Sequence, residues 1–157
     1  MARLLLVRHA RAGERGHGPE DLERPLDVRG EAQAAALPEL LRPVLAGSDG
    51  EVEVRSSPAR RCIATVAPLA TEFRTEVVID AALVEGSDVR PLRARIATLT
   101  GTTVWSSHGD IIPELLMMLA RRGVDLGDDP RCRKGSTWVL DVTGGEVTAA
   151  RYLPPPV

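Results

Sequence analysis

The feature that most constrains the fold is an alternation of short strand-like segments with longer helical ones. Residues 2–7, 51–57, 77–83 and 102–107 are short and rich in apolar or β-branched side chains, and a segment with helical periodicity comes after each of them. Strands separated by helices in this way form parallel sheets that carry helices on both faces. We therefore expect a three-layer α/β/α fold around a mostly parallel sheet.

Helix ends and breaks can be predicted from particular residues. Asp27 is expected to cap the first helix, and Pro38 to break or kink it. Pro58 is suited to the first turn of the second helix. Residues 11–26 are polar and rich in Gly, Glu and Arg, which is typical of a long loop. The helices themselves are expected at residues 28–45, 59–73, 89–99 and 111–123.

The C-terminal part of the sequence predicts a β-hairpin. Two strand-like segments at 136–142 and 146–153 are separated by Gly144 and Gly145, a pair that favours a tight turn. The hairpin would add antiparallel strands to one edge of the sheet. At this length, and without a linker-like segment, we expect one domain over residues 1–157.

Composition excludes several classes of protein. The longest apolar runs are far shorter than the roughly 18 residues of a membrane-spanning helix, and the N-terminal run is too short for a signal peptide, so we expect a cytoplasmic protein. The net charge of −2 argues against a nucleic-acid or anionic-membrane partner. Cys62 and Cys132 are expected to be small buried side chains, and Trp105 and Trp138 to belong to the core.

Polar side chains gather where the predicted strands end. Ligands of open α/β sheets bind beyond the carboxyl ends of the strands, so residues at these ends are expected to share one site. The helices that follow direct their N-termini toward the same edge, which favours an anion there. The residues concerned are Arg8 and His9 after the first strand, Ser57, Arg60 and Arg61 after the second, and His108 after the fourth.

This set of side chains fits phosphoryl transfer. A neutral imidazole is a good nucleophile toward phosphorus, and His9 follows a strand that would fix its orientation. Arg8, Arg60 and His108 would neutralise the oxygens of the transferred group, because guanidinium groups bind phosphate in a bidentate manner. Since arginines can supply this charge, the reaction needs no magnesium ion and no cofactor is expected.

The remaining roles fall to loop residues. Glu85 follows the third strand and is the leading candidate for the proton donor to the leaving oxygen, with Asp88 in reserve. Arg11, Ser57 and Lys134 are possible substrate contacts. His17 lies in the 11–26 loop and is expected at the surface. Three histidines without close spacing make a poor metal site, so no metal is expected.

Four motifs in order resemble the histidine phosphatase superfamily, also called phosphoglycerate mutase-like. They are RHA at 8–10, SSPARRCIAT at 56–65, ALVEG at 82–86 and SHG at 107–109. The resemblance implies a phosphoglycerate mutase-like fold, a phosphohistidine intermediate on His9, and Arg60 rather than Arg61 in the phosphate pocket. RHA in place of the usual RHG is similar to the small bacterial phosphohistidine-phosphatase (SixA-like) type.

A closer resemblance is to the C-terminal phosphatase domain of actinobacterial two-domain Nudix hydrolases. It is carried by SHGDIIPELL at 107–116, CRKGSTWVLDV at 132–142 and ARYLPPP at 150–156. In those proteins the domain acts on nucleotide or other phosphate products. The chain starts at the phosphatase strand, so we expect either a stand-alone relative or an isolated domain.

The sequence therefore predicts a phosphohydrolase whose substrate is a nucleotide or another small phosphate compound. A protein phosphohistidine phosphatase and a phosphate-binding regulatory module without turnover are the alternatives. A phosphoglycerate-type mutase is less favoured, because retaining the phosphoryl group benefits from an enclosing lid and residues 11–26 form the one long loop predicted here.

Overall fold

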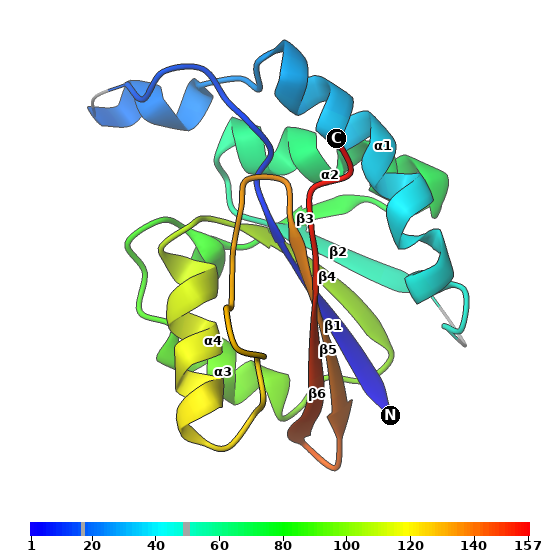
Figure 1. Ribbon diagram of the computed structural model, residues 1–157. Helices are drawn as coiled ribbons and strands as arrows, with labels where there is room; N and C mark the ends of the chain where they lie inside the picture. The colour runs from blue at the N-terminus through cyan, green and yellow to red at the C-terminus, as the bar shows by residue number, and fades with distance from the viewer. Residues whose placement is uncertain (17, 49–50) are drawn as a thin grey trace.

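A six-stranded sheet forms the centre of the computed structural model, which describes residues 1–16, 18–48 and 51–157 (Figure 1). The strand order is β3-β2-β4-β1-β5-β6. The first four strands in the chain run parallel, whereas β5 is antiparallel to both of its neighbours, which confirms the predicted sheet with its C-terminal hairpin. The strands are β1 (Ala2–Arg8), β2 (Val52–Ser56), β3 (Val77–Ile79), β4 (Thr102–Ser107), β5 (Thr137–Thr143) and β6 (Glu146–Leu153).

Helices cover both faces of this sheet, as the alternating pattern predicts. Figure 1 shows α1 and α2 together on one face, and α3 and α4 on the other. The three-layer α/β/α architecture is thereby confirmed. The helices are α1 (Val28–Leu45), α2 (Arg60–Glu72), α3 (Arg90–Ile96) and α4 (Ile111–Arg121), with short 3-10 helices at Gly18–Glu23 and Ala81–Leu83.

The central strand β1 is buried on both faces, which is why its sequence is continuously apolar. Successive side chains of a strand point to opposite faces. Leu4 accordingly packs with α3 and α4, while Leu5 packs with α1 and α2. Trp105 and Trp138 are both 1% exposed and belong to the first of these clusters, which confirms their predicted place in the core.

Two predicted helix and turn signals are confirmed. The Asp27 carboxylate accepts a hydrogen bond from the Gly30 amide at 2.7 Å and caps α1. The glycines of the β5–β6 turn have φ angles of 59° at Gly144 and 78° at Gly145, a left-handed conformation that only glycine adopts without strain. Pro38 lies inside α1, which continues through it to Leu45.

Three local expectations need correction. Pro58 precedes α2 instead of occupying its first turn, because Ala59 is still extended at the cap position. The third strand ends at Ile79, since the Asp80 side chain accepts a hydrogen bond from the Ala82 amide at 3.0 Å and starts a 3-10 turn. The 11–26 loop contains a 3-10 helix. The expected surface position of His17 lies outside the described residues.

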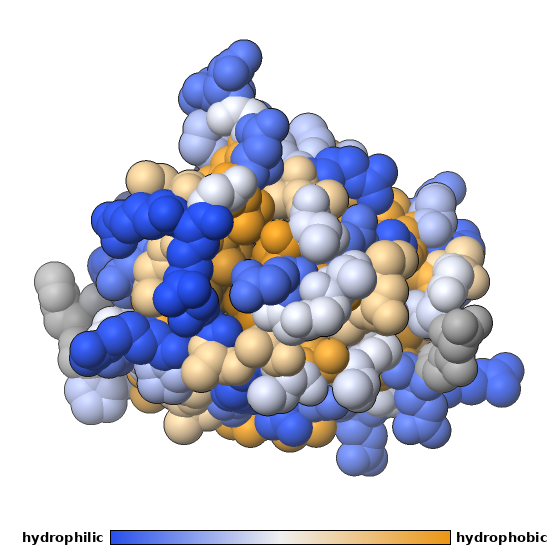
Figure 2. Space-filling view, turned by 90° about the horizontal axis from the view of Figure 1, so that it is seen from below, coloured by the Kyte–Doolittle hydropathy of each residue, from blue (hydrophilic) through white to orange (hydrophobic). Residues whose placement is uncertain are grey.

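The two ends of the sheet carry different features: a small cavity lies at one end, and the carboxyl ends of the parallel strands lie at the other. Figure 2, seen from below, shows hydrophilic residues around a hollow where apolar side chains are exposed. A cavity of about 160 Å³ at the end that holds the β5–β6 turn is lined by parts of α3, α4 and the turn residue Gly145. The carboxyl ends of the parallel strands lie at the opposite end of the molecule. No helix in the described part of the chain is both long enough and apolar enough to span a membrane.

Candidate active site

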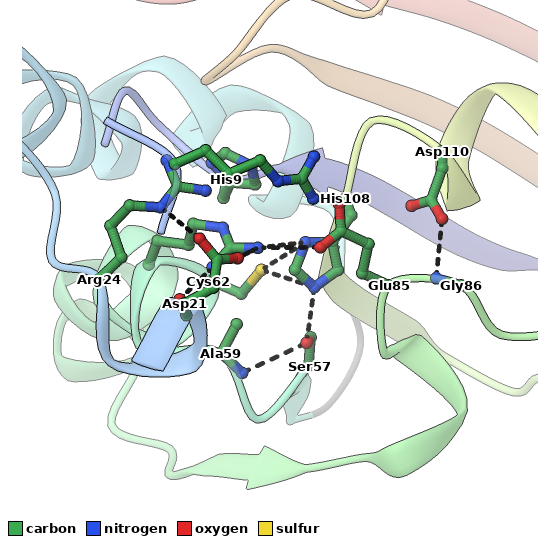
Figure 3. A network of polar contacts seen from close by, with 12 residues as sticks. His9, Asp21, Arg24, Ser57, Ala59, Cys62, Glu85, Gly86, His108 and Asp110 are labelled. Carbon is green, nitrogen blue, oxygen red and sulfur yellow. Dashed lines mark hydrogen bonds and ion pairs between the residues drawn. The ribbon is translucent and has the colours of Figure 1, made fainter. Parts of the chain in front are cut away.

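The two predicted site histidines leave the sheet side by side. Arg8 of β1 pairs with Ser107 of β4 in a parallel register, so the next residue of each strand falls at the same edge. The His9 amide donates a hydrogen bond to the Ser107 carbonyl at 3.0 Å. The imidazole rings of His9 and His108 then lie with their centroids 5.7 Å apart and their planes inclined by 66° (Figure 3).

His9 is held in a form that can act as a nucleophile. Its Nδ1 lies 2.8 Å from the Ala10 carbonyl oxygen, which can only accept, so Nδ1 carries the proton and Nε2 keeps a free lone pair. Burial, together with the positive charge of Arg61, lowers the pKa of His9 from its ordinary 6.5 to about 3, against the opposing Ala10 hydrogen bond. At neutral pH the imidazole is therefore uncharged, as attack on phosphorus requires.

The His108 ring is held in place by a hydrogen bond to the buried side chain of Ser57. A guanidinium only donates hydrogen bonds, so His108 Nδ1 accepts from Arg61 at 3.3 Å and Nε2 donates to Ser57 Oγ at 2.8 Å. Cys62 Sγ packs 3.6 Å from the same Nε2. Burial, followed by the charge of Arg61, lowers the pKa of His108 from 6.5 to about 4.

Ser57 was predicted as a possible substrate contact, and the structure corrects this. Its side chain is fully buried and lies behind the His108 ring, where the Ala59 amide also donates to it. Figure 3 shows Ser57 and Ala59 on the side of His108 away from His9. Ser57 therefore positions His108 and does not line the site cavity.

The arginine of α2 that reaches the site is Arg61, which corrects the choice of Arg60. Neighbouring residues of a helix point about 100° apart. Arg61 shares the buried face of α2 with Thr65, one turn later, whose hydroxyl donates to the Arg61 carbonyl at 2.7 Å. Arg61 is 1% exposed, whereas Arg60 faces solvent. The helical spacing that places Arg61 and Thr65 on the same face of α2 is the signal in the sequence that favours Arg61 over Arg60.

Arg61 is oriented by two carboxylates. Its guanidinium lies 3.3 Å from the Asp21 carboxylate and 3.4 Å from that of Glu85, and it also donates to the Asp21 carbonyl at 2.9 Å. Arg24 donates to Asp21 from the other side at 3.0 Å. Sequence reasoning missed Asp21 and Arg24, because nothing in the polar 11–26 segment distinguishes them from solvated loop residues.

Arg8 lies flat against a glycine. Its Nη1 donates to the Cys132 carbonyl at 2.6 Å, which fixes the guanidinium at the end of β1. A Cβ atom at Gly109 would lie 2.6 Å from the Arg8 guanidinium carbon, so the glycine of the SHG motif makes room for this side chain. The Nε atoms of Arg8 and Arg61 are both buried and have no hydrogen-bond partner among the described residues.

Of the two carboxylates considered as proton donors, only Glu85 is at the site. It forms ion pairs with Arg61 at 3.4 Å and with Arg15, and its side chain is 37% exposed. Asp88 is bound at 2.6 Å by Arg90, which is itself exposed, and does not line the cavity between the histidines. Asp88, the reserve candidate for the proton donor, therefore lies away from the site.

These residues surround a cavity of about 470 Å³. Positive side chains outnumber carboxylates in its wall, which suits a phosphoryl dianion. Lys134 lines it, whereas Arg11 lines a neighbouring cavity; their contacts with substrate stay predictions. Within the described ranges, no group of three or more His, Cys, Asp or Glu side chains could hold a metal ion. The charged lining residues are Arg8, Arg15, Arg24, Arg61, Lys134, Glu14, Glu85 and Asp110.

The lowered histidine pKa values predict a loss of stability in mild acid. An unfolded chain protonates both imidazoles near pH 6.5, but the folded chain does so only near pH 3 and pH 4, so this stability is complete above pH 6.5 and lost as the pH falls. Between pH 7 and pH 5 we expect the free energy of unfolding to decrease by about 2 kcal/mol for each histidine. Urea denaturation followed by circular dichroism measures it.

A His9→Gln/His108→Gln double variant is the control for this pH dependence. It should lose most of the change between pH 7 and pH 5, because most carboxyl groups titrate at lower pH. An unfolding free energy of the wild-type protein that stays constant over this range would contradict the buried, neutral state of the two rings.

Comparison with known proteins agrees with this geometry. The sequence profile of the histidine phosphatase superfamily (branch 1) matches residues 4–88, which include the ends of β1 and β2 and the Glu85 loop. The chain therefore belongs to the histidine phosphatase superfamily, a family of histidine-dependent phosphatases. The match agrees with the family resemblance found in the sequence motifs.

Individual relatives indicate that the chain is one of the small members of this superfamily. The chain is 36% identical to an 8-oxo-(d)GTP phosphatase of Mycolicibacterium smegmatis over 98% of its own length and 48% of that protein, so it spans about half of this curated relative. It is 25% identical to the SixA structure from Nakamurella multipartitia, with a TM-score of 0.74 over 98% of this chain and 96% of that one. The tungstate complex of the protein histidine phosphatase SixA shares the fold, at 18% identity, a TM-score of 0.78 and coverage of 98% and 97%.

Proposed function

We propose that the protein is a phosphohydrolase that removes a terminal phosphoryl group through a phosphohistidine intermediate on His9. The observation that carries the proposal is the His9 imidazole, oriented by its Nδ1 contact with the Ala10 carbonyl, beside the guanidinium groups of Arg8 and Arg61 at one cavity. In the first step the Nε2 lone pair of His9 forms a bond to phosphorus as the bond to the leaving oxygen breaks. Glu85, in its protonated form, supplies the proton that this oxygen needs.

The second step returns the enzyme to its starting state. Water attacks the phosphorus of phosphohistidine, the P–N bond breaks, and Glu85 accepts the proton that the water loses. Arg8 and Arg61, which line the cavity, neutralise the equatorial oxygens in both steps. When the dianion binds, His108, which is neutral in the resting state, takes up a proton from solvent on Nδ1 in place of the Arg61 hydrogen bond and adds positive charge.

A nucleotide is the favoured substrate. The relative that shares 36% identity with the chain is named an 8-oxo-(d)GTP phosphatase, and the match covers nearly all of this chain. The cavity wall carries more positive than negative side chains and opens to solvent beside the exposed Arg15, which suits a small anionic compound. A phosphohistidine residue on a protein is the second candidate, supported by the likeness to SixA structures.

Phosphate release from a substrate panel tests the proposal and separates the candidates. Nucleoside mono-, di- and triphosphates, small phosphomonoesters and a phosphohistidine protein should be compared with wild-type enzyme and a His9→Gln variant. We expect His9-dependent release to be fastest from a nucleotide. Release from the phosphohistidine protein alone would favour the second candidate. Phosphate binding without any turnover would indicate a regulatory module, and interconversion of monophosphoglycerates would indicate a mutase.

A further inference from the structure

A second cavity adjoins the first and shares Lys134 with it. Its volume is about 450 Å³, close to that of the site cavity. Among the described residues, its lining contains no Asp or Glu side chain. Gln33 also lines it, together with Pro154, Pro155 and Val157 of the C-terminal segment, which lies beside α1 in Figure 1. The cationic residues that line it are Arg11, Arg29, Arg133 and Lys134.

The loop that carries Lys134 is attached to the end of β1. The Gly135 amide donates to the His9 carbonyl at 3.0 Å, and Arg8 donates to the Cys132 carbonyl at 2.6 Å. Gly135 has a φ angle of 83°, a conformation that favours glycine. Lys134 is therefore held between the two cavities by the same strand end that presents His9.

Hydrogen bonds also fix the part of the second cavity that Arg11 and Gln33 form. The Arg11 amide donates to the Gln33 side chain at 3.0 Å, and the Arg11 carbonyl accepts from the Asp27 amide at 3.0 Å. A Cβ at Gly30 would lie 1.8 Å from that carbonyl oxygen, so only glycine lets the chain after β1 pack this closely on α1. Arg29 precedes this glycine in the first turn of α1.

The cationic side chains of this cavity have few carboxylate side chains as partners. Arg29, Arg133 and Lys134 form no ion pair with any carboxylate that the structure describes, and the Arg11 guanidinium lies 3.7 Å from Asp27. A cation in the first turn of a helix, such as Arg29, also opposes the helix dipole. Burial and the charges of nearby arginines lower the pKa of Lys134, an unfavourable interaction that a bound anion would relieve.

We infer that the second cavity binds a further phosphoryl group of the substrate, so that the preferred substrates are nucleoside di- or triphosphates or other compounds with two phosphoryl groups. This inference rests on the proposed function, because it places the reacting phosphoryl group at His9. Lys134 lines both cavities and can contact both groups of one substrate. A simple phosphomonoester would leave Arg29 and Arg133 without a ligand.

Calorimetric titration with two probes tests the inference. Methylenediphosphonate is a diphosphate analogue that cannot be hydrolysed at its bridging carbon, and inorganic phosphate represents the single group. In an Arg29→Gln/Arg133→Gln variant we expect the Kd of methylenediphosphonate to rise about tenfold. The Kd of phosphate should change less than about twofold, since neither residue lines the site cavity. An Arg121→Gln/Arg122→Gln variant removes the same charge at the far end of α4 and should leave both constants unchanged.

The outcomes separate this inference from the proposed function. If wild-type protein releases phosphate through His9 but the Arg29/Arg133 variant binds both probes as wild type does, the inference alone is overturned. If the Arg121/Arg122 control variant raises the Kd of methylenediphosphonate by as much, the effect comes from net charge alone, and the inference is also overturned. If no substrate is hydrolysed while the selective loss of methylenediphosphonate is seen, the proposed function fails and the diphosphate site stands.

Discussion

Replacing His9 with glutamine is expected to lower kcat/KM for phosphate release at least about 10³-fold, because the reaction loses its nucleophile. Glutamine fills a similar volume, so the surroundings of His9, which is 5% exposed, should keep their shape. Rapid mixing of wild-type enzyme with a ³²P-labelled substrate, followed by an alkaline quench that preserves phosphohistidine, should trap labelled protein. The variant should remain unlabelled.

Phosphate binding is the control that gives this result its meaning. Arg8, Arg61 and His108 are unchanged in the variant, so inorganic phosphate should still bind with a Kd within about tenfold of the wild-type value. Loss of turnover together with retained binding identifies His9 as the nucleophile. Label incorporation at the wild-type level in the His9→Gln protein would contradict that assignment.

Arg61 and Arg60 form a natural matched pair. We expect Arg61→Ala to lower kcat about 10²- to 10³-fold, because a buried donor that faces the transferred group is lost. Arg60→Ala should change kcat less than about twofold, since this side chain faces solvent and surface substitutions are usually mild. Both variants remove one positive charge from adjacent positions, so their comparison separates a local contact from a general effect of charge.

Steady-state kinetics of the two variants would check this expectation, with thermal unfolding as the measure of folding. Arg61 also holds Asp21 and Glu85, so Arg61→Lys provides a second test that keeps the charge but lacks the bidentate geometry. It should recover little of the lost activity. Equal losses in Arg60→Ala and Arg61→Ala would remove Arg61 from the reaction.

The fold was largely predictable from the sequence because its strands are short, regular and separated by helices. The apolar stretch of β1 predicts a strand buried on two faces, and Gly144–Gly145 predicts the terminal turn. The end of β3 was placed too late, because Asp80 can cap a 3-10 turn as readily as it can follow a strand. Such local competition between side chain and backbone leaves little trace in a pattern of hydrophobicity.

The site was predictable where it depends on strand ends and less so where it depends on a helix face or a loop. His9 and His108 follow paired strands, so the sheet register alone brings them together. Choosing between Arg60 and Arg61 needed the phase of α2, which the spacing from Thr65 supplies. Asp21 reaches Arg61 across 40 positions of the chain, a contact that no local pattern encodes.

The position of β1 in the sheet also governs when the site can form. Its two neighbours, β4 and β5, both follow β2 and β3 in the chain and are therefore made well after β1. Contacts between residues so far apart in sequence form slowly, because a long loop must close first. A chain emerging from the ribosome thus carries His9, the proposed nucleophile, long before it has an active site, and His9 gains its partner ring only after β4 has joined the sheet.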